Sequence, residues 1–267
     1  MSPQPASAPG SPTGSLLAEI IEAHGGRERW LSSTELSVQV SAGGLAIASK
    51  LQRTGLRDLE ARVSTDRPRL VFTPYPRTGY RGVFDQGEVR IETDQGGVIG
   101  ERSDPRRALH SPRRLLRWDQ LDLLYFGGSA LWTYMATPFV FTEPGFHVQA
   151  GQPWAERGEQ WRTLSVTFPA DFHTHSRQQV FYVGDDGLIR RHDYTAEEFG
   201  HWAKSAHYWL DHHTFDGLVI PKQRRVFPRR SDNRAHRHPL LVWIDVRAVS
   251  LPPAPPGAML DGCDRRA

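Results

Sequence analysis

Histidine, aspartate and arginine side chains gather in one stretch of the sequence. His173 and His175 lie two residues apart, Arg191 and Asp193 follow, and His207 stands in the next apolar segment. An imidazole beside a carboxylate can exchange protons near neutral pH, and one such step contributes on the order of 10²–10⁴-fold to a rate. We therefore take His175 and Asp193 as a candidate acid/base pair, with His207 in support and Arg191 as a nearby cation.

The same histidines allow a metal site as an alternative. Residues two apart in a strand share one face, so His173 and His175 point the same way. Such a pair with a third histidine, His207, matches a zinc or iron ligand set. The chain has 12 histidines, so chance proximity is common. We expect no cofactor and keep the metal enzyme as a second alternative.

Consecutive antiparallel strands must position these side chains. Between residues 161 and 228, β-branched and aromatic residues alternate with polar ones, and turns are marked at residues 184–187 and at Asp216-Gly217. Our functional interpretation places His175, Asp193 and His207 on the concave face of a curved sheet. The alternation leaves open which face is concave, and paired polar residues on a solvated face are the other interpretation of each residue.

The rest of the chain predicts a mainly β fold with few helices. Residues 15–26 match an amphipathic helix that ends at Gly25-Gly26, and a meander of short strands begins near residue 35. An apolar helical insert at about 105–136 interrupts the strands, and Gly127-Gly128 predicts a break into two helices. We expect one half-barrel domain over residues 15–250, a disordered tail over 1–14 and a further tail over 251–267.

Large aromatic residues in and after the insert suggest a pocket. Ordinary core packing is the other interpretation of each of them. A half-barrel of this size leaves a cavity that some of these residues should border. The candidate substrate-binding residues are Trp118, Tyr125, Trp132, Tyr134, Phe139 and Tyr194.

Composition excludes several classes of protein. The net charge is +3, and the arginine-rich run at 102–117 comes without a nucleic-acid motif, so we expect no nucleic-acid partner. The glycine patterns of nucleotide-binding and serine-hydrolase sites do not occur. The single cysteine, Cys263, gives no disulfide framework. No secretory signal or membrane span is evident, which leads us to expect a cytoplasmic protein without membrane insertion.

The N-terminal pattern resembles a known superfamily. An amphipathic helix ends in His24-Gly25-Gly26, Trp30 and Leu31 follow, and a long meander broken by apolar helices comes next. This arrangement is similar to the lipoprotein-carrier (LolA/LolB-type) superfamily, which includes periplasmic lipoprotein carriers and a cytoplasmic enzyme of violacein biosynthesis. The resemblance implies a large curved antiparallel sheet, an incomplete barrel, whose concave face is covered by the N-terminal helix and the insert.

Three functions follow as hypotheses. The first is a cofactor-independent enzyme of secondary metabolism, an isomerase, cyclase or dehydratase that acts on an apolar or aromatic small molecule by acid/base catalysis. The alternative is a non-catalytic carrier or binding protein for a lipid or hydrophobic metabolite. The second alternative is the His-ligated metal enzyme. A homodimer is compatible with each of them.

Overall fold

One antiparallel sheet of 14 strands organises the computed structural model, which describes residues 12–252. The strand order is β6-β5-β4-β3-β2-β1-β14-β13-β12-β11-β10-β9-β7, and β8 pairs with β9 beside this path. The outermost strands of this order do not pair with each other, so the sheet is not closed into a barrel. The predicted incomplete barrel is confirmed.

The elements follow the chain in short steps. The strands are β1 (Glu35–Gly43), β2 (Leu59–Ser64), β3 (Arg69–Thr73), β4 (Tyr80–Asp85), β5 (Glu88–Thr93), β6 (Val98–Arg102), β7 (His147–Ala150), β8 (Trp154–Glu156), β9 (Glu159–Thr167), β10 (Gln178–Val183), β11 (Ile189–Thr195), β12 (Lys204–Phe215), β13 (Leu218–Pro228) and β14 (Val242–Ser250). The helices are α1 (Pro12–Ala23), α2 (Arg27–Leu31), α3 (Leu45–Ala48), α4 (Pro105–Leu109), α5 (Pro112–Leu116), α6 (Gln120–Ala136) and the 3-10 helix η1 (Phe139–Thr142).

The consecutive strands predicted between residues 161 and 228 are confirmed. They are β9 to β13, and each pairs with the next. Asp216 and Gly217 connect β12 to β13, and both have positive φ (45° and 86°). Positive φ at both central residues is what a two-residue type I′ hairpin requires. The turn therefore fixes the register of the two longest strands, which carry His207 and its neighbours.

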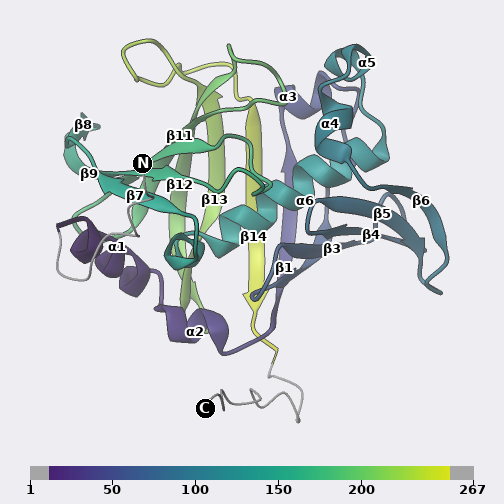
Figure 1. The fold of residues 1–267 in the computed structure, drawn as a ribbon, viewed down its shortest axis with the longest axis horizontal. Coiled ribbons are helices and arrows are strands. Elements are labelled where there is room, and N and C mark those ends of the chain that lie inside the picture. Colours follow the sequence, from purple (N-terminus) through teal and green to yellow (C-terminus); the bar gives the residue numbers. More distant parts are fainter. Residues whose placement is uncertain (1–11, 253–267) are drawn as a thin grey trace, which may run out of the picture.

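The apolar insert forms α4, α5 and α6, and the long helix α6 lies against the concave face of the sheet. Figure 1 shows α6 crossing in front of β12 to β14, with the sheet curving around it. The predicted break at Gly127-Gly128 is wrong, because α6 is continuous from Gln120 to Ala136. A Cβ on Gly128 would lie 2.7 Å from the Cβ of Phe84, so the absent side chain lets the helix approach the sheet. The glycines serve packing instead of ending the helix.

The N-terminal helix begins earlier than the sequence suggested. It starts at Pro12, so residues 12–14 are helical and the predicted tail is wrong there. The remainder of that tail, residues 1–11, and most of the C-terminal one, residues 253–267, lie outside the described residues. After α1, Gly25 has a φ of 108°, and a Cβ there would lie 2.2 Å from the carbonyl oxygen of Gly217.

None of the helices in the described part of the chain is both long and apolar enough to cross a bilayer.

Candidate functional site

The register of β11 on β12 decides which predicted site residues lie together. His192 is directly opposite His207, and Tyr194 is opposite Ser205. Residues directly opposite in an antiparallel pair point to the same face. His192, Tyr194 and His207 therefore share the concave face, where the ring of Tyr134 from α6 lies 4.9 Å from that of His207. Of the predicted catalytic group, His207 is on the concave face.

Asp193 and Arg191 lie on the opposite, convex face, so their predicted place beside His207 is wrong. The period of two in β11 sends them away from His192. Both side chains are buried, and the guanidinium of Arg191 donates to both Asp193 carboxylate oxygens at 2.7 Å. Arg191 also donates to Glu156 at 2.5 Å, and the hydroxyl of Tyr182 donates to Asp193 at 2.8 Å. This network is closed and saturated, which suits a structural role.

His175 has a carboxylate partner, but a different one from the predicted Asp193. Its Nδ1 lies 2.7 Å from Oε1 of Glu198, in the connection between β11 and β12. His175 is 4% exposed and stacks on Tyr194 with ring centroids 5.5 Å apart. Because an ionised carboxylate only accepts, Nδ1 of His175 is the donor in this hydrogen bond. A His-carboxylate pair thus exists on the concave side with Glu198 in place of Asp193.

A cluster of buried polar side chains lies between α6 and strands β11 to β13. We call it the polar cluster. Trp209 donates through Nε1 to Nδ1 of His192 at 2.8 Å, so a neutral His192 carries its proton on Nε2. The hydroxyls of Tyr134 and Tyr194 are hydrogen-bonded to each other. The members of the cluster are Tyr134, His175, His192, Tyr194, His207 and Arg224.

Burial controls the charges in the polar cluster. It lowers the pKa of His192 and of His207 well below the usual histidine value, and the nearby charge of Arg224 lowers both further. Burial also raises the pKa of Tyr134 to about 12. The pKa of Arg224 is lowered to about 9, again because of burial. At neutral pH the two histidines are therefore neutral and Arg224 is the positive charge.

An apolar cavity of about 40 Å³ lies between α6 and the sheet. Its walls come from β1, β2, β3, β14, α3 and α6, and nearly all are aliphatic or aromatic. His175, Tyr194 and Tyr134 form its polar end. We call it the interlayer cavity. It joins the apolar interior to the polar cluster, because these three residues belong to both.

A second hollow opens on the other side of α6. It has a volume of about 720 Å³ and extends over α2, η1, the end of α6 and the loops after β2, β4 and β9. We call it the end groove. Its floor is aromatic, and Trp30 stacks on Phe139 there with ring centroids 5.0 Å apart. Its rim is charged and includes the ion pair of Arg27 with Glu143 at 2.8 Å.

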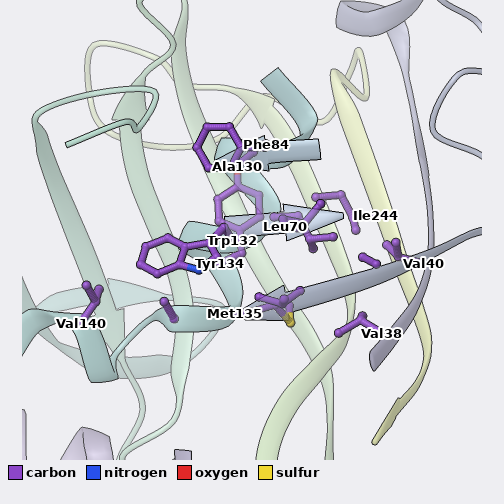
Figure 2. Packing of buried hydrophobic residues seen from close by; sticks show 14 of the residues in the cluster. Val38, Val40, Leu70, Phe84, Ala130, Trp132, Tyr134, Met135, Val140 and Ile244 are labelled. Atoms are coloured by element: carbon purple, nitrogen blue, oxygen red, sulfur yellow. The ribbon is translucent and has the colours of Figure 1, made fainter. Parts of the chain in front are cut away.

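Four of the six predicted substrate-binding aromatics border these hollows. Tyr134 and Tyr194 line the interlayer cavity, while Trp132 and Phe139 line the end groove. Figure 2 shows Trp132 projecting away from Val40 and Ile244, which line the cavity. The other two aromatics line neither hollow. Trp118 is fully buried, with its ring centroid 5.0 Å from that of Phe126. The hydroxyl of Tyr125 is hydrogen-bonded to Nδ1 of His173 at 2.9 Å.

The ligand set of the metal alternative is not brought together. His173 pairs with Tyr125, His175 pairs with Glu198, and His207 lies among aromatic rings. Within residues 12–252, no group of three or more histidine, cysteine, aspartate or glutamate side chains is arranged to hold a metal ion. The arrangement of the predicted ligands therefore contradicts this alternative.

Sequence reasoning missed three residues of the site, His192, Glu198 and Arg224, and the phase of β11 places His192 on the concave face. Glu198 lies in a connection whose path the alternation does not predict. Arg224 lies in the run Lys222 to Arg225, which reads as an exposed, charged strand. A signal did exist for Arg224, because it is opposite Trp209, which alternates in phase with His207. The register of β12 on β13 would have placed it on the concave face.

Comparisons with known proteins concern the fold. No family model matches the chain, and no curated protein matches it. Among solved structures, a DUF1329 family protein from Desulfovibrio piger is similar with a TM-score of 0.50 at 12% identity, over 90% of this chain and 93% of that one. A LolA superfamily protein from Nitrosomonas europaea is similar with a TM-score of 0.50 at 11% identity, over 88% and 93%.

At such identities the likeness concerns fold and leaves activity open. Neither protein is the violacein-pathway enzyme, so that part of the resemblance stays a prediction. The structural similarity extends over 88–90% of this chain and 93% of each of the two others, so it includes most of the open antiparallel sheet described above. The chain therefore has a LolA-like fold.

Proposed function

We propose that the protein binds a hydrophobic small molecule alongside α6, on the concave side of the sheet, without transforming it. The observation that carries the proposal is the position of α6 between two hollows, the interlayer cavity and the end groove. Ligand pockets commonly measure about 300–1,000 Å³ and have mainly apolar and aromatic walls. The end groove, at about 720 Å³, has the volume, and the interlayer cavity has the apolar interior.

Opposite faces of α6 line the two hollows. Ala130, Leu131 and Tyr134 border the interlayer cavity, whereas Trp132 and Ala136 border the end groove. The cavity of about 40 Å³ is much smaller than an engineered apolar cavity of roughly 150 Å³ that holds one benzene molecule. An apolar chain of several carbon atoms would therefore reach this cavity from the groove only if the last turns of α6 were displaced. That displacement would join the two hollows.

The fold supports a binding protein over the enzyme hypothesis. The superfamily that the sequence resembles includes lipoprotein carriers, and the chain has a LolA-like fold. The saturated pairing of Asp193 also removes the predicted acid/base pair, since that carboxylate is engaged by Arg191 and Tyr182 on the convex face. A binding role needs only the apolar space beside α6.

Phe172→Asp in the end groove is expected to weaken binding of a neutral hydrophobic probe. Phe172 lies half-buried on the groove floor, 5.9 Å from Trp132 between ring centroids. A carboxylate there must be desolvated when an apolar ligand covers it, which reduces affinity about 10- to 100-fold. The measurement is fluorescence titration with N-phenyl-1-naphthylamine, followed by displacement with 1-decanol.

The matched control is Trp202→Asp, because Trp202 is an aromatic side chain that is 79% exposed and lines neither hollow. This variant should keep the wild-type affinity. The proposal fails if the wild-type protein binds neither probe. The assignment to the groove fails if Phe172→Asp and Trp202→Asp have equal effects.

A proton-transfer enzyme is a second candidate, and one observation favours it. His175 holds its Nδ1 against Glu198 at 2.7 Å and lines the interlayer cavity. In such a reaction Nε2 of His175 would take a proton from a carbon acid in the cavity, leave an enolate on the substrate, and then return the proton. Glu198 would stabilise the imidazolium between these steps.

Exchange of carbon-bound protons tests this second candidate. The wild-type protein should accelerate deuterium exchange at the α-carbons of 4-phenyl-2-butanone in D₂O, measured by proton NMR. Glu198→Gln should slow this exchange about 10²-fold or more, in the range typical of lost acid/base assistance. Exchange at the uncatalysed rate with wild-type protein would eliminate the enzyme hypothesis for this class of substrate and leave the binding proposal intact.

A further inference from the structure

Arg224 carries a buried positive charge that lacks a counter-ion. It lies on the concave face of β13, 1% exposed, with its guanidinium 3.8 Å above the ring of Trp209 and 4.9 Å from that of Tyr134. Its Nη2 donates to the backbone oxygen of Tyr134 at 3.1 Å, while Nε and Nη1 are buried without a partner. None of the ion pairs among the described residues involves Arg224.

The other fully buried arginine of these strands has the opposite arrangement. Arg191 is 0% exposed, and its guanidinium is held by Asp193 and Glu156. Burial without a partner is expensive for a charge, whereas burial with hydrogen-bonded carboxylates is tolerated. On the convex face, Arg191 therefore has its counter-ions within the chain, whereas Arg224 on the concave face lacks an anionic partner.

His207 provides a second unused donor near Arg224. It is 0% exposed, and neither ring nitrogen has a hydrogen-bond partner. It lies one strand away and is paired with Val226, two residues from Arg224 on the same face. A neutral imidazole keeps one N–H group, so His207 and Arg224 together present unsatisfied hydrogen-bond donors next to the ring of Tyr134.

We infer that Arg224, supported by His207, receives the carboxylate head group of an amphiphilic ligand whose apolar chain lies alongside α6. The inference rests on the proposed function, because the chain of the ligand needs the apolar space beside α6. A guanidinium matches a carboxylate in charge, planarity and hydrogen-bond geometry. Tyr134 connects the two parts, since it lines the interlayer cavity and contacts both Arg224 and His207.

Two probes with equal chains and different heads test the inference. Decanoate and 1-decanol share the ten-carbon chain, and only decanoate carries an anion. We expect the wild-type protein to bind decanoate about 10- to 100-fold more tightly than 1-decanol, as a charge-assisted hydrogen bond allows. Arg224→Met should abolish this preference and leave the affinity for 1-decanol unchanged, as measured by displacement of N-phenyl-1-naphthylamine.

The control variant is Lys222→Met. Lys222 is half-buried on the same strand and face, so the variant removes an equal charge two residues from Arg224. It should keep the wild-type preference for decanoate. Arg224→Met should also raise the melting temperature of the free protein by several degrees, because an unpaired buried charge is replaced by an apolar side chain.

Each outcome discriminates. If the wild-type protein binds the two probes equally, the head-group site is refuted and the proposed function still stands. The same conclusion follows if Arg224→Met keeps the preference for decanoate. Binding of neither probe overturns both. If Arg224→Met does not fold, Arg224→Lys keeps the charge but loses the planar fork, and its preference for decanoate should fall below that of Lys222→Met.

Discussion

Lowering the pH from 7 to 4.5 is expected to destabilise the folded protein by roughly 5 kcal/mol through His24 and His212 alone, because buried neutral histidines must accept protons on unfolding. Burial lowers the pKa of His24 to about 4 and that of His212 to about 4, and it holds His192 and His207 well below the usual value. An unfolded histidine has a pKa of about 6.5. This amount is a large part of the usual stability of a domain, about 5–15 kcal/mol.

The sign follows from the protons bound in each state. Between pH 6.5 and about 4, the unfolded chain binds more protons at these histidines than the folded one does, so stability rises with pH. The stability that neutral histidines contribute is thus fully present above pH 6.5 and is lost as the pH falls towards 4. Carboxylates with lowered pKa values titrate below this window, as Asp119 does with a pKa of about 2.

Urea denaturation followed by tryptophan fluorescence at pH 7.0, 5.5 and 4.5 measures this loss. His207→Met should have a shallower dependence on pH, because one buried imidazole no longer titrates on unfolding. His238→Gln is the matched control, since His238 is exposed and its replacement should leave the curve unchanged. A wild-type stability that is flat between pH 7.0 and 4.5 would contradict the burial of these rings.

The fold could be predicted from local patterns because its strands join mainly to their chain neighbours. Alternation and turn residues gave β9 to β13 in order, and Asp216-Gly217 marks a hairpin that needs no distant information. The continuity of α6 through Gly127-Gly128 was not predictable in this way. It depends on Phe84, a residue of β4, lying where a side chain on Gly128 would stand.

The candidate site was harder to predict because a strand has two faces, and the sequence does not indicate which of them is concave. Residue type alone favours His175 and Asp193 as partners, but Asp193 lies on the convex face, where it pairs with Arg191. Successive side chains of β11 point to opposite faces, so His192 lies on the concave face and its neighbour Asp193 on the convex one. Arg224 could be recognised only through its pairing with Trp209, because this pairing depends on the register of β12 on β13.

Asp193→Asn is expected to destabilise the protein by about 3–5 kcal/mol without changing its affinity for 1-decanol. The carboxylate accepts two hydrogen bonds from Arg191 and one from Tyr182, and Arg229 lies 3.6 Å away. Its loss leaves the buried guanidinium of Arg191 with Glu156 as its remaining carboxylate partner. Removing one partner of a buried ion pair carries a penalty of this size.

Chemical denaturation of Asp193→Asn and Asp245→Asn at pH 7 separates a buried pair from an exposed one. Asp245 pairs with Arg225 at 2.7 Å, but its side chain is 42% exposed, so its loss should change stability by about 0–1 kcal/mol. The double variant Arg191→Met with Asp193→Leu should be more stable than Asp193→Asn, because the buried guanidinium is gone and Glu156, the carboxylate left without it, keeps its hydrogen bonds from Trp154 and Tyr208. If Asp193→Asn instead kept wild-type stability and lost binding or proton exchange, the acid/base role expected of Asp193 would be restored, and the structural role of the convex network would be refuted.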